Sequence, residues 1–200
     1  VGLKSGKITA LAHSGKYLFA GTADSGVYIF NGYVGSDRYW QKINNGLGNL
    51  KITALVALDS ITILAGTEGS GVYKSANKGA SWTLISSAVL SGTTVTGLVK
   101  AGNHLFLTSA NTGVFISSDN GATWADFNDS NTLNIAGTTS VSFNATTNQL
   151  IISNKNGLYS TLLTTPPPVA AYTAVSTGLP SNTTVRSISN NGSLWLLATD

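Results

Sequence analysis

The chain of 200 residues has no cysteine and no methionine, four prolines, and only 8 acidic and 11 basic side chains. The lack of cysteine excludes disulfides, thiolate metal sites and a cysteine nucleophile, and leaves the redox compartment undetermined. No run of about 18 apolar residues occurs, so we predict no transmembrane segment. The only arginines are Arg38 and Arg186, and the lysines are scattered. The formal charge of +3 therefore forms no basic stripe, and we expect no nucleic-acid partner.

Glycine, in contrast, is abundant: 22 residues interrupt any long helix. Between the glycines, apolar and polar residues alternate with a period of two, as in residues 94–118, with turn residues between the runs. This composition and this period predict an all-β protein with many turns.

Internal repetition is the main signal in the sequence. Similar segments begin at Lys7, Lys51, Thr94, Ser140 and Val185. Apolar anchors recur every 43 to 45 residues, at Leu11, Leu55, Leu98, Phe143 and Ile188. Each repeat contains four short strands; in repeat three we expect them at about 94–100, 104–109, 113–118 and 123–127.

A repeat of about 40–50 residues with four antiparallel strands is typical of a β-propeller blade, which needs neighbours on both faces to bury its surface. We predict a single β-propeller domain over residues 1–200. Its blades would lie at about 7–50, 51–93, 94–138 and 139–183, with a half blade at 184–200. We expect either further sequence or another chain to complete the half blade, which makes self-association through its open edge one expectation.

An aromatic residue recurs at the start of the fourth strand. Trp40, Trp82 and Trp124 are 42 residues apart, and Tyr172 occupies the equivalent place in repeat four. We interpret these four side chains as packing between blades, because large rings supply most of the buried area in such an interface.

The turn before the aromatic carries a specific motif. Residues 117–124 read S-S-D-N-G-A-T-W and residues 75–82 read S-A-N-K-G-A-S-W. The first resembles the Asp-box, S-x-D-x-G-x-T-W, of sialidase-like (BNR) repeats, and the second is a softened copy. The resemblance is to Asp-box propellers, including photosystem II assembly factor-like and xyloglucanase-like secreted bacterial proteins. It implies a structural role for these residues: Ser117, Asp119, Gly121, Thr123 and Trp124, with Ser75, Asn77, Gly79, Ser81 and Trp82.

Catalysis receives little support from the residues. The sialidase pattern requires three arginines and a tyrosine–glutamate pair, whereas the chain has two arginines and a single glutamate, Glu68. The other acidic residues lie in no distinctive motif that would mark a glycosidase pair. His13 and His104 occupy different repeat positions, so we predict no metal site and no cofactor.

A binding site is expected on the face formed by the loops between strands two and three and between blades. The candidate residues differ in charge from repeat to repeat: Asp24, Glu68, Asn111, Lys155 and Asp200. We therefore expect a non-catalytic, secreted or cell-surface bacterial propeller that binds a protein or glycan. Two alternatives stay open: a fragment of a xyloglucanase-like glycoside hydrolase, and a structural subunit that assembles through its open blade edge.

Overall fold

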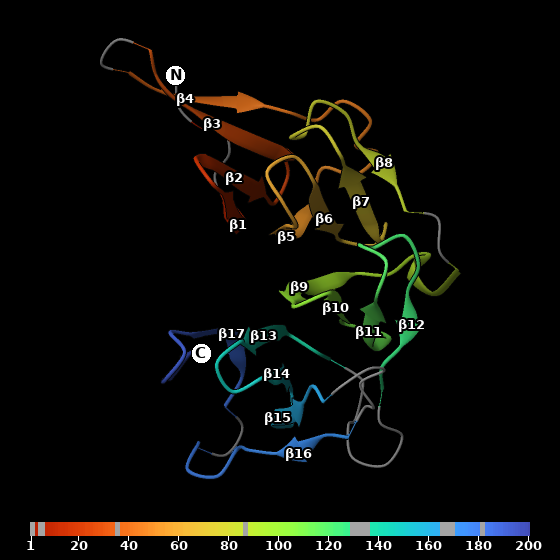
Figure 1. The fold of residues 1–200 in the computed structure, drawn as a ribbon, viewed down its shortest axis with the longest axis vertical. Helices are drawn as coiled ribbons and strands as arrows, with labels where there is room; N and C mark the ends of the chain where they lie inside the picture. The colour runs from red at the N-terminus through yellow and green to blue at the C-terminus, as the bar shows by residue number, and fades with distance from the viewer. Residues whose placement is uncertain are drawn as a thin grey trace. The chain divides into compact units, whose positions relative to one another are not determined.

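The computed structural model describes residues 3, 7–34, 37–85, 88–128, 137–164, 171–180 and 183–200. Within them the chain forms eighteen β-strands and one 3₁₀ turn, η1 (Ala88–Leu90), and no α-helix, which confirms the all-β prediction. It divides into two compact units, Val1–Val95 and Thr96–Asp200, which we describe separately. Figure 1 traces both units from the N- to the C-terminus.

The first unit holds two four-stranded antiparallel sheets, each with its strands in sequence order. Repeat one comprises β1 (Ile8–Ser14), β2 (Tyr17–Thr22), β3 (Val27–Val34) and β4 (Asp37–Lys42). Repeat two comprises β5 (Ile52–Ala57), β6 (Ile63–Thr67), β7 (Val72–Ser75) and β8 (Thr83–Leu84). The first strands of the two sheets, β1 and β5, lie against one another.

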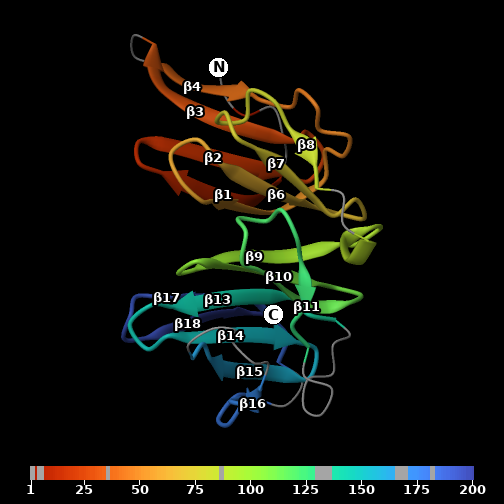
Figure 2. The same ribbon diagram turned by 45° about the vertical axis from the view of Figure 1, so that its right-hand side comes forward.

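The second unit continues the same plan. Repeat three comprises β9 (Val95–Ala101), β10 (His104–Ser109), β11 (Gly113–Ser117) and β12 (Ala125–Asp126). Repeat four comprises β13 (Ser140–Asn144), β14 (Gln149–Asn154), β15 (Gly157–Leu162) and β16 (Thr173–Ala174), and Figure 2 shows its first three strands side by side. Repeat five contributes β17 (Val185–Asn190) and β18 (Trp195–Thr199).

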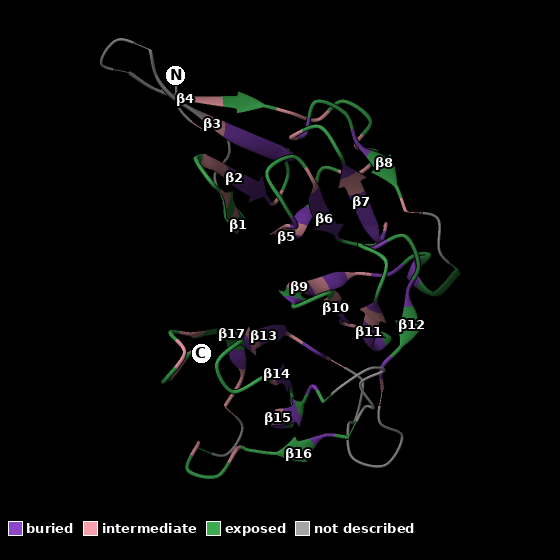
Figure 3. Ribbon diagram, in the orientation of Figure 1, coloured by how far each residue is buried: buried purple, intermediate pink, exposed green. Residues whose placement is uncertain are grey.

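The fourth strands of repeats two to four are short and exposed, whereas the middle strands are buried. In Figure 3, β8, β12 and β16 are exposed, and all six of their residues face solvent. The observed β12 has two residues where we expected about five, because the hydrogen-bonded turn before it uses residues 117–124. The ladders therefore rely on strands two and three, as expected for the centre of a twisted sheet.

The register of the first strands corrects one anchor. Leu11 pairs with Ala20, Leu55 with Ala65 and Ile188 with Leu197. In each strand this is the second residue pair after the β-bulge. In repeat four this position is held by Val141, which pairs with Ile152. Our expected anchor, Phe143, is therefore wrong by two residues. Residues two apart in a strand point to the same face, so the alternating pattern alone does not tell whether Val141 or Phe143 is the equivalent position.

Packing between neighbouring sheets buries the apolar face of each. In the first unit, Phe19, Ile29, Ile52, Leu55 and Trp82 belong to one buried cluster that draws on both sheets. In the second unit, equivalent clusters join repeat three to four and repeat four to five.

Two of the recurring aromatics, Trp82 and Tyr172, pack between sheets, as we predicted, whereas Trp40 lies against Phe30 of its own sheet with ring centres 5.3 Å apart. The Trp82 indole Nε1 donates to the Ile43 carbonyl of repeat one at 2.6 Å, and the Tyr172 hydroxyl donates to the Phe127 carbonyl of repeat three at 3.1 Å. The two acceptors occupy equivalent repeat positions, so tyrosine replaces tryptophan and keeps the hydrogen bond between sheets. This satisfies the polar tip of a ring that is otherwise buried.

Candidate binding face

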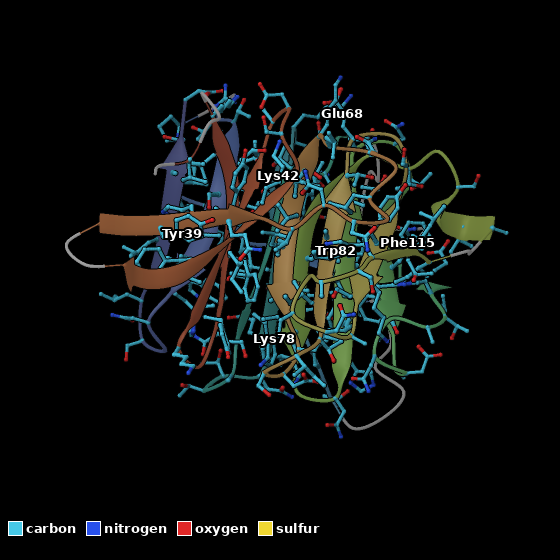
Figure 4. The ribbon with its side chains drawn as sticks, turned by 90° about the horizontal axis from the view of Figure 1, so that it is seen from above. Tyr39, Lys42, Glu68, Lys78, Trp82 and Phe115 are labelled. Atoms are coloured by element: carbon cyan, nitrogen blue, oxygen red, sulfur yellow. The ribbon has the colours of Figure 1, made fainter. Side chains whose placement is uncertain are left out.

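The turns of each repeat lie at two ends of its strands. We call the end with the turns between strands two and three, together with the connections between repeats, the loop face. The opposite end, with the turns between strands one and two and between strands three and four, we call the box face. In the second repeat, Figure 4 shows Glu68 of the loop face and Lys78 of the box face at opposite ends of the strands.

A buried polar residue shapes each loop-face turn. The Thr22 hydroxyl donates to the Gly26 carbonyl at 2.8 Å, and the Thr67 hydroxyl donates to the Gly71 carbonyl at the same distance. In repeat three, Ser109 accepts instead from the backbone N–H of Asn111 at 3.2 Å. These side chains act as local turn acceptors or donors, so the residues that follow them project into solvent.

A second polar residue, which our sequence analysis missed, clamps the start of the third strand. Asn44 Oδ1 accepts from the Val27 N–H at 2.8 Å, and Asn128 Oδ1 accepts from the Val114 N–H at 2.9 Å. The Ser176 hydroxyl performs the same task for Leu158 at 2.8 Å. A signal was present: each clamp stands directly after the fourth strand, at a matching place in its repeat.

In the first unit, the candidate residues Asp24 and Glu68 are exposed and already have partners. Asp24 Oδ1 accepts from the Ser25 hydroxyl at 2.8 Å. The Glu68 carboxylate lies 3.4 Å from Lys51 Nζ, and the Glu68 carbonyl accepts from Asn49 Nδ2 at 2.8 Å. Because the ion pair is exposed, it contributes less than about 1 kcal/mol to stability.

In the second unit, the candidates Asn111, Lys155 and Asp200 are also exposed. Arg186 Nε donates to the Asp200 carboxylate. Lys155 stands beside the connection from repeat three to repeat four, where its stem would be about 3.7 Å from a Cβ placed on Gly137. The structure thus places Asp24, Glu68, Asn111 and Lys155 in loop-face turns, and Asp200 at the loop-face end of β18.

An open hollow adjoins the loop-face turn in repeats two and four. The hollow of repeat two, of about 560 Å³, is lined by Ser70, Tyr73, Leu84 and Leu90 among others. The hollow of repeat four, of about 350 Å³, is lined by Lys155, Asn156, Ser176 and Leu179 among others. Each lies between the turn from strand two to three and the connection to the next repeat. Both volumes lie within the range of small-ligand sites, and their linings differ: serines, leucines and a tyrosine in one, mainly polar groups with a lysine in the other.

At the box face, the two motif turns share one hydrogen-bond scheme. Ser117 Oγ accepts from the Gly121 N–H at 2.9 Å, and Ser75 Oγ accepts from the Gly79 N–H at 2.8 Å. Each glycine has a positive φ, +82° for Gly121 and +86° for Gly79, which a side chain would strain.

The acceptor of these turns is a carboxylate in one and an amide in the other. Asp119 Oδ1 accepts from the Thr123 N–H and Asn77 Oδ1 accepts from the Ser81 N–H, both at 2.8 Å. Desolvation raises the pKa of Asp119, but the hydrogen bonds from Thr123, Ser117 and Ala122 outweigh it and lower that pKa to about 2. Asp119 is thus a held anion in a turn and a poor proton donor.

Among the described residues, no three acidic or histidine side chains gather as metal ligands would. In the same residues, no helix has both the length and the apolar character needed to cross a membrane.

Tandem four-stranded antiparallel sheets, packed face to face through their apolar sides, define a β-propeller. The family comparison agrees, since the model described as the DUF6242 beta propeller domain matches residues 35–195. The chain belongs to this family. A comparison with curated proteins finds no relative that matches the sequence.

Solved structures share the fold at low identity. The extracellular domain of the two-component system BT4673 from B. thetaiotaomicron is 17% identical with a TM-score of 0.76, over 100% of this chain and 26% of that one. The GH74 xyloglucanase from Xanthomonas campestris is 17% identical with a TM-score of 0.71, over 98% of this chain and 34% of that one. A structure of a nidogen/laminin complex is 12% identical with a TM-score of 0.72, over 96% of this chain and 72% of that one. The chain thus spans about a quarter to a third of the first two proteins.

Proposed function

We propose that this propeller domain is a non-catalytic binding scaffold that takes a glycan or protein on its loop face. One observation carries the proposal: the same hollow recurs in repeats two and four with unlike linings. A repeated scaffold that varies only where its turns meet solvent is how a fold presents a site without changing its core.

The partners of the acidic candidates support binding over catalysis. Glu68 is paired with Lys51, Asp200 with Arg186, and Asp24 with the Ser25 hydroxyl. A glycosidase needs two carboxyl groups that face each other across the scissile bond, about 5–10 Å apart. Pairing of each acid with a neighbour on its own repeat favours turn structure and surface recognition.

The hydrogen bonds of the two motif turns and the nature of the similar structures support finer parts of the proposal. The shared hydrogen-bond scheme of residues 75–82 and 117–124 supports their assignment as Asp-boxes of the sialidase-like (BNR) type. A secreted or cell-surface location in a bacterium is supported by the extracellular domain among the similar structures. Carbohydrate is our first ligand class, because a xyloglucanase shares this fold.

A glycan panel measured by calorimetry tests this function, with xyloglucan oligosaccharides, other neutral polysaccharides and acidic ones. We expect a ligand whose affinity falls about tenfold in Ser91→Trp, which fills the repeat-two hollow, and stays unchanged in Ser193→Trp. Ser193 is an exposed serine in the turn between β17 and β18 and serves as the matched control. Equal loss in both variants, or no binding across the panel, would overturn a glycan site in this hollow.

The glycoside hydrolase alternative has one observation in its favour: Asp24 and Glu68 lie in equivalent turns of neighbouring repeats. The same panel separates it from binding. New reducing ends after incubation with xyloglucan, abolished in Glu68→Gln and retained in Asp126→Asn, would establish hydrolysis and refute the non-catalytic proposal. Asp126 is an exposed acid outside the loop-face turns and controls for lost charge.

A further inference from the structure

At the box face of the first unit, two lysines converge on one tyrosine. Lys78 Nζ lies 3.2 Å from the Tyr17 hydroxyl and 4.7 Å from the centre of its ring. Lys16 Nζ lies 5.6 Å from the same ring centre. Lys78 comes from the motif turn of repeat two, residues 75–82. Lys16 lies in the turn between β1 and β2 of repeat one, and Tyr17 is the first residue of β2. The cluster therefore depends on the packing of two sheets.

Among the described residues, no carboxylate forms an ion pair with either ammonium group. Ion pairs among the described residues join Lys51 to Glu68 and Arg186 to Asp200, and neither includes Lys16 or Lys78. A tyrosine ring attracts an exposed cation by only about 0.5–1 kcal/mol. Two cations close to one ring raise the local positive potential, so an anion bound beside them would be favoured.

The backbone holds Lys78 in position. Lys78 has φ +60°, in the left-handed region, and its N–H donates to the Ile61 carbonyl of the preceding turn at 2.8 Å. The next residue, Gly79, is tied by its N–H to Ser75. The stem of Lys78 therefore starts from a fixed point, which reduces the entropy lost when its head is immobilised.

The donors of the cluster suit an oxyanion. Lys78 gives one N–H to the Tyr17 oxygen and keeps two for another acceptor. Because the Tyr17 oxygen accepts this bond, its own O–H is available to donate outward. Lys16 adds a third donor group from an exposed turn. The lysines also lower the pKa of Tyr17, mainly through the hydrogen bond from Lys78 and then through the charges of Lys78 and Lys16.

We propose that Lys16, Tyr17 and Lys78 form a binding site for an oxyanion, a sulfate ester or carboxylate, carried by an acidic polysaccharide. This site lies at the box face, so it is separate from the loop-face function proposed above. A polysaccharide is favoured over nucleic acid because the described residues offer one such pair of cations and the sequence has no basic stripe. Nucleic acids need several phosphate contacts to bind at physiological salt.

Two other titratable groups stand on the turns that surround the cluster. His13 is exposed near the end of β1. Asp59 lies on the β5–β6 turn, where its Oδ1 accepts from the N–H groups of Ile61 and Thr62, both at 2.8 Å. The Asp59 carboxylate is thus engaged by its own turn, and the ring of Tyr17 is left to the two lysines.

Calorimetry with a sulfated oligosaccharide and its desulfated counterpart tests the site. We expect binding of the sulfated form only, weakened about tenfold by Lys78→Gln and less by Lys16→Gln, because a charge-assisted contact is lost. Lys78→Arg should retain binding. The matched control is Lys42→Gln, since Lys42 Nζ lies alone at 5.6 Å from the Tyr28 ring, and it should leave affinity unchanged.

A spectroscopic readout separates binding from a folding defect. The oxyanion should offset the charge of both lysines, so the pKa of Tyr17 should rise towards its ordinary value. The pKa is followed by the absorbance of tyrosinate during a pH titration. Subtracting the titration of Tyr17→Phe isolates the signal of Tyr17. Inorganic sulfate alone should do the same at much higher concentration. The proposal fails if Lys42→Gln weakens binding as much as Lys78→Gln, or if the desulfated form binds equally. It also fails if RNA or anionic vesicles bind more tightly than the sulfated oligosaccharide.

Discussion

The turns at residues 75–82 and 117–124 close the same hairpin in two repeats with different acceptors. Asn77 and Asp119 hold the N–H of the fourth residue along at the same 2.8 Å. The difference appears in the side chains: the Thr123 hydroxyl donates to Asp119 at 2.5 Å, whereas Asn77 Nδ2 donates to the Ser81 hydroxyl at 2.8 Å. The turn therefore needs an acceptor at this position but not a charge, and the carboxylate adds a stronger bond and a dependence on pH.

Removal of the shared serine should have the largest effect. Ser75 and Ser117 are each 1% exposed and accept from a glycine N–H inside the turn. Ser75→Ala and Ser117→Ala should each lower the free energy of unfolding by about 1–3 kcal/mol, because a buried donor is left unsatisfied. Urea denaturation and amide exchange at Gly79 and Gly121 measure this. Unequal losses in the two turns would show that the shared geometry does not carry the stability.

Asp119→Asn should have a smaller, pH-dependent effect. The pKa of Asp119 is lowered to about 2 in the folded protein, from the ordinary aspartate value of 3.8. The ionised form is thus favoured by folding, and its contribution is present above about pH 4 and lost as the pH falls towards 2. Stability of the wild type and of Asp119→Asn, measured by urea denaturation, should differ near pH 6 and converge at low pH. A constant difference across this range would contradict the assignment, and carboxyl NMR of Asp119 provides the direct titration.

Lys78→Asn should have the smallest effect on stability and a large one on binding. Lys78 and Asn120 occupy the same place, with φ +60° and +56°, and asparagine adopts the left-handed region more readily than lysine. The variant should gain less than about 1 kcal/mol in thermal denaturation while it loses the oxyanion. A destabilised Lys78→Asn would show that the contact between Lys78 and Tyr17 supports the fold more than it serves a ligand.

Much of the fold could be predicted because the repeat exposes it. Strands, turns and the aromatic of the fourth strand follow from a period of two and from glycine at fixed intervals. The frame within a strand was harder: alternation makes Val141 and Phe143 equivalent in pattern, and only the pairing with Ile152 identifies Val141 as the anchor. The clamp residues Asn44, Asn128 and Ser176 were missed because two residue types perform the task.

Burial also required the structure. Leu11 and Leu55 occupy the same repeat position, yet Leu11 is 63% exposed and Leu55 is 8% exposed. The difference lies in the neighbours: Leu55 packs in the cluster formed with the sheet of repeat one. A side chain's identity and spacing indicate which face it occupies, but its burial depends on the sheet that packs against that face.

The class of fold and the positions of the turns, including those at 75–82 and 117–124, could be read from the sequence, because they depend on local alternation and on turn chemistry within about ten residues. Which loop-face turns border a hollow became known from the folded structure. It also brought Lys78 to Tyr17, 61 residues away in the chain. The physical reason is that a site between two sheets depends on how their turns come together in space, and no local pattern records that contact.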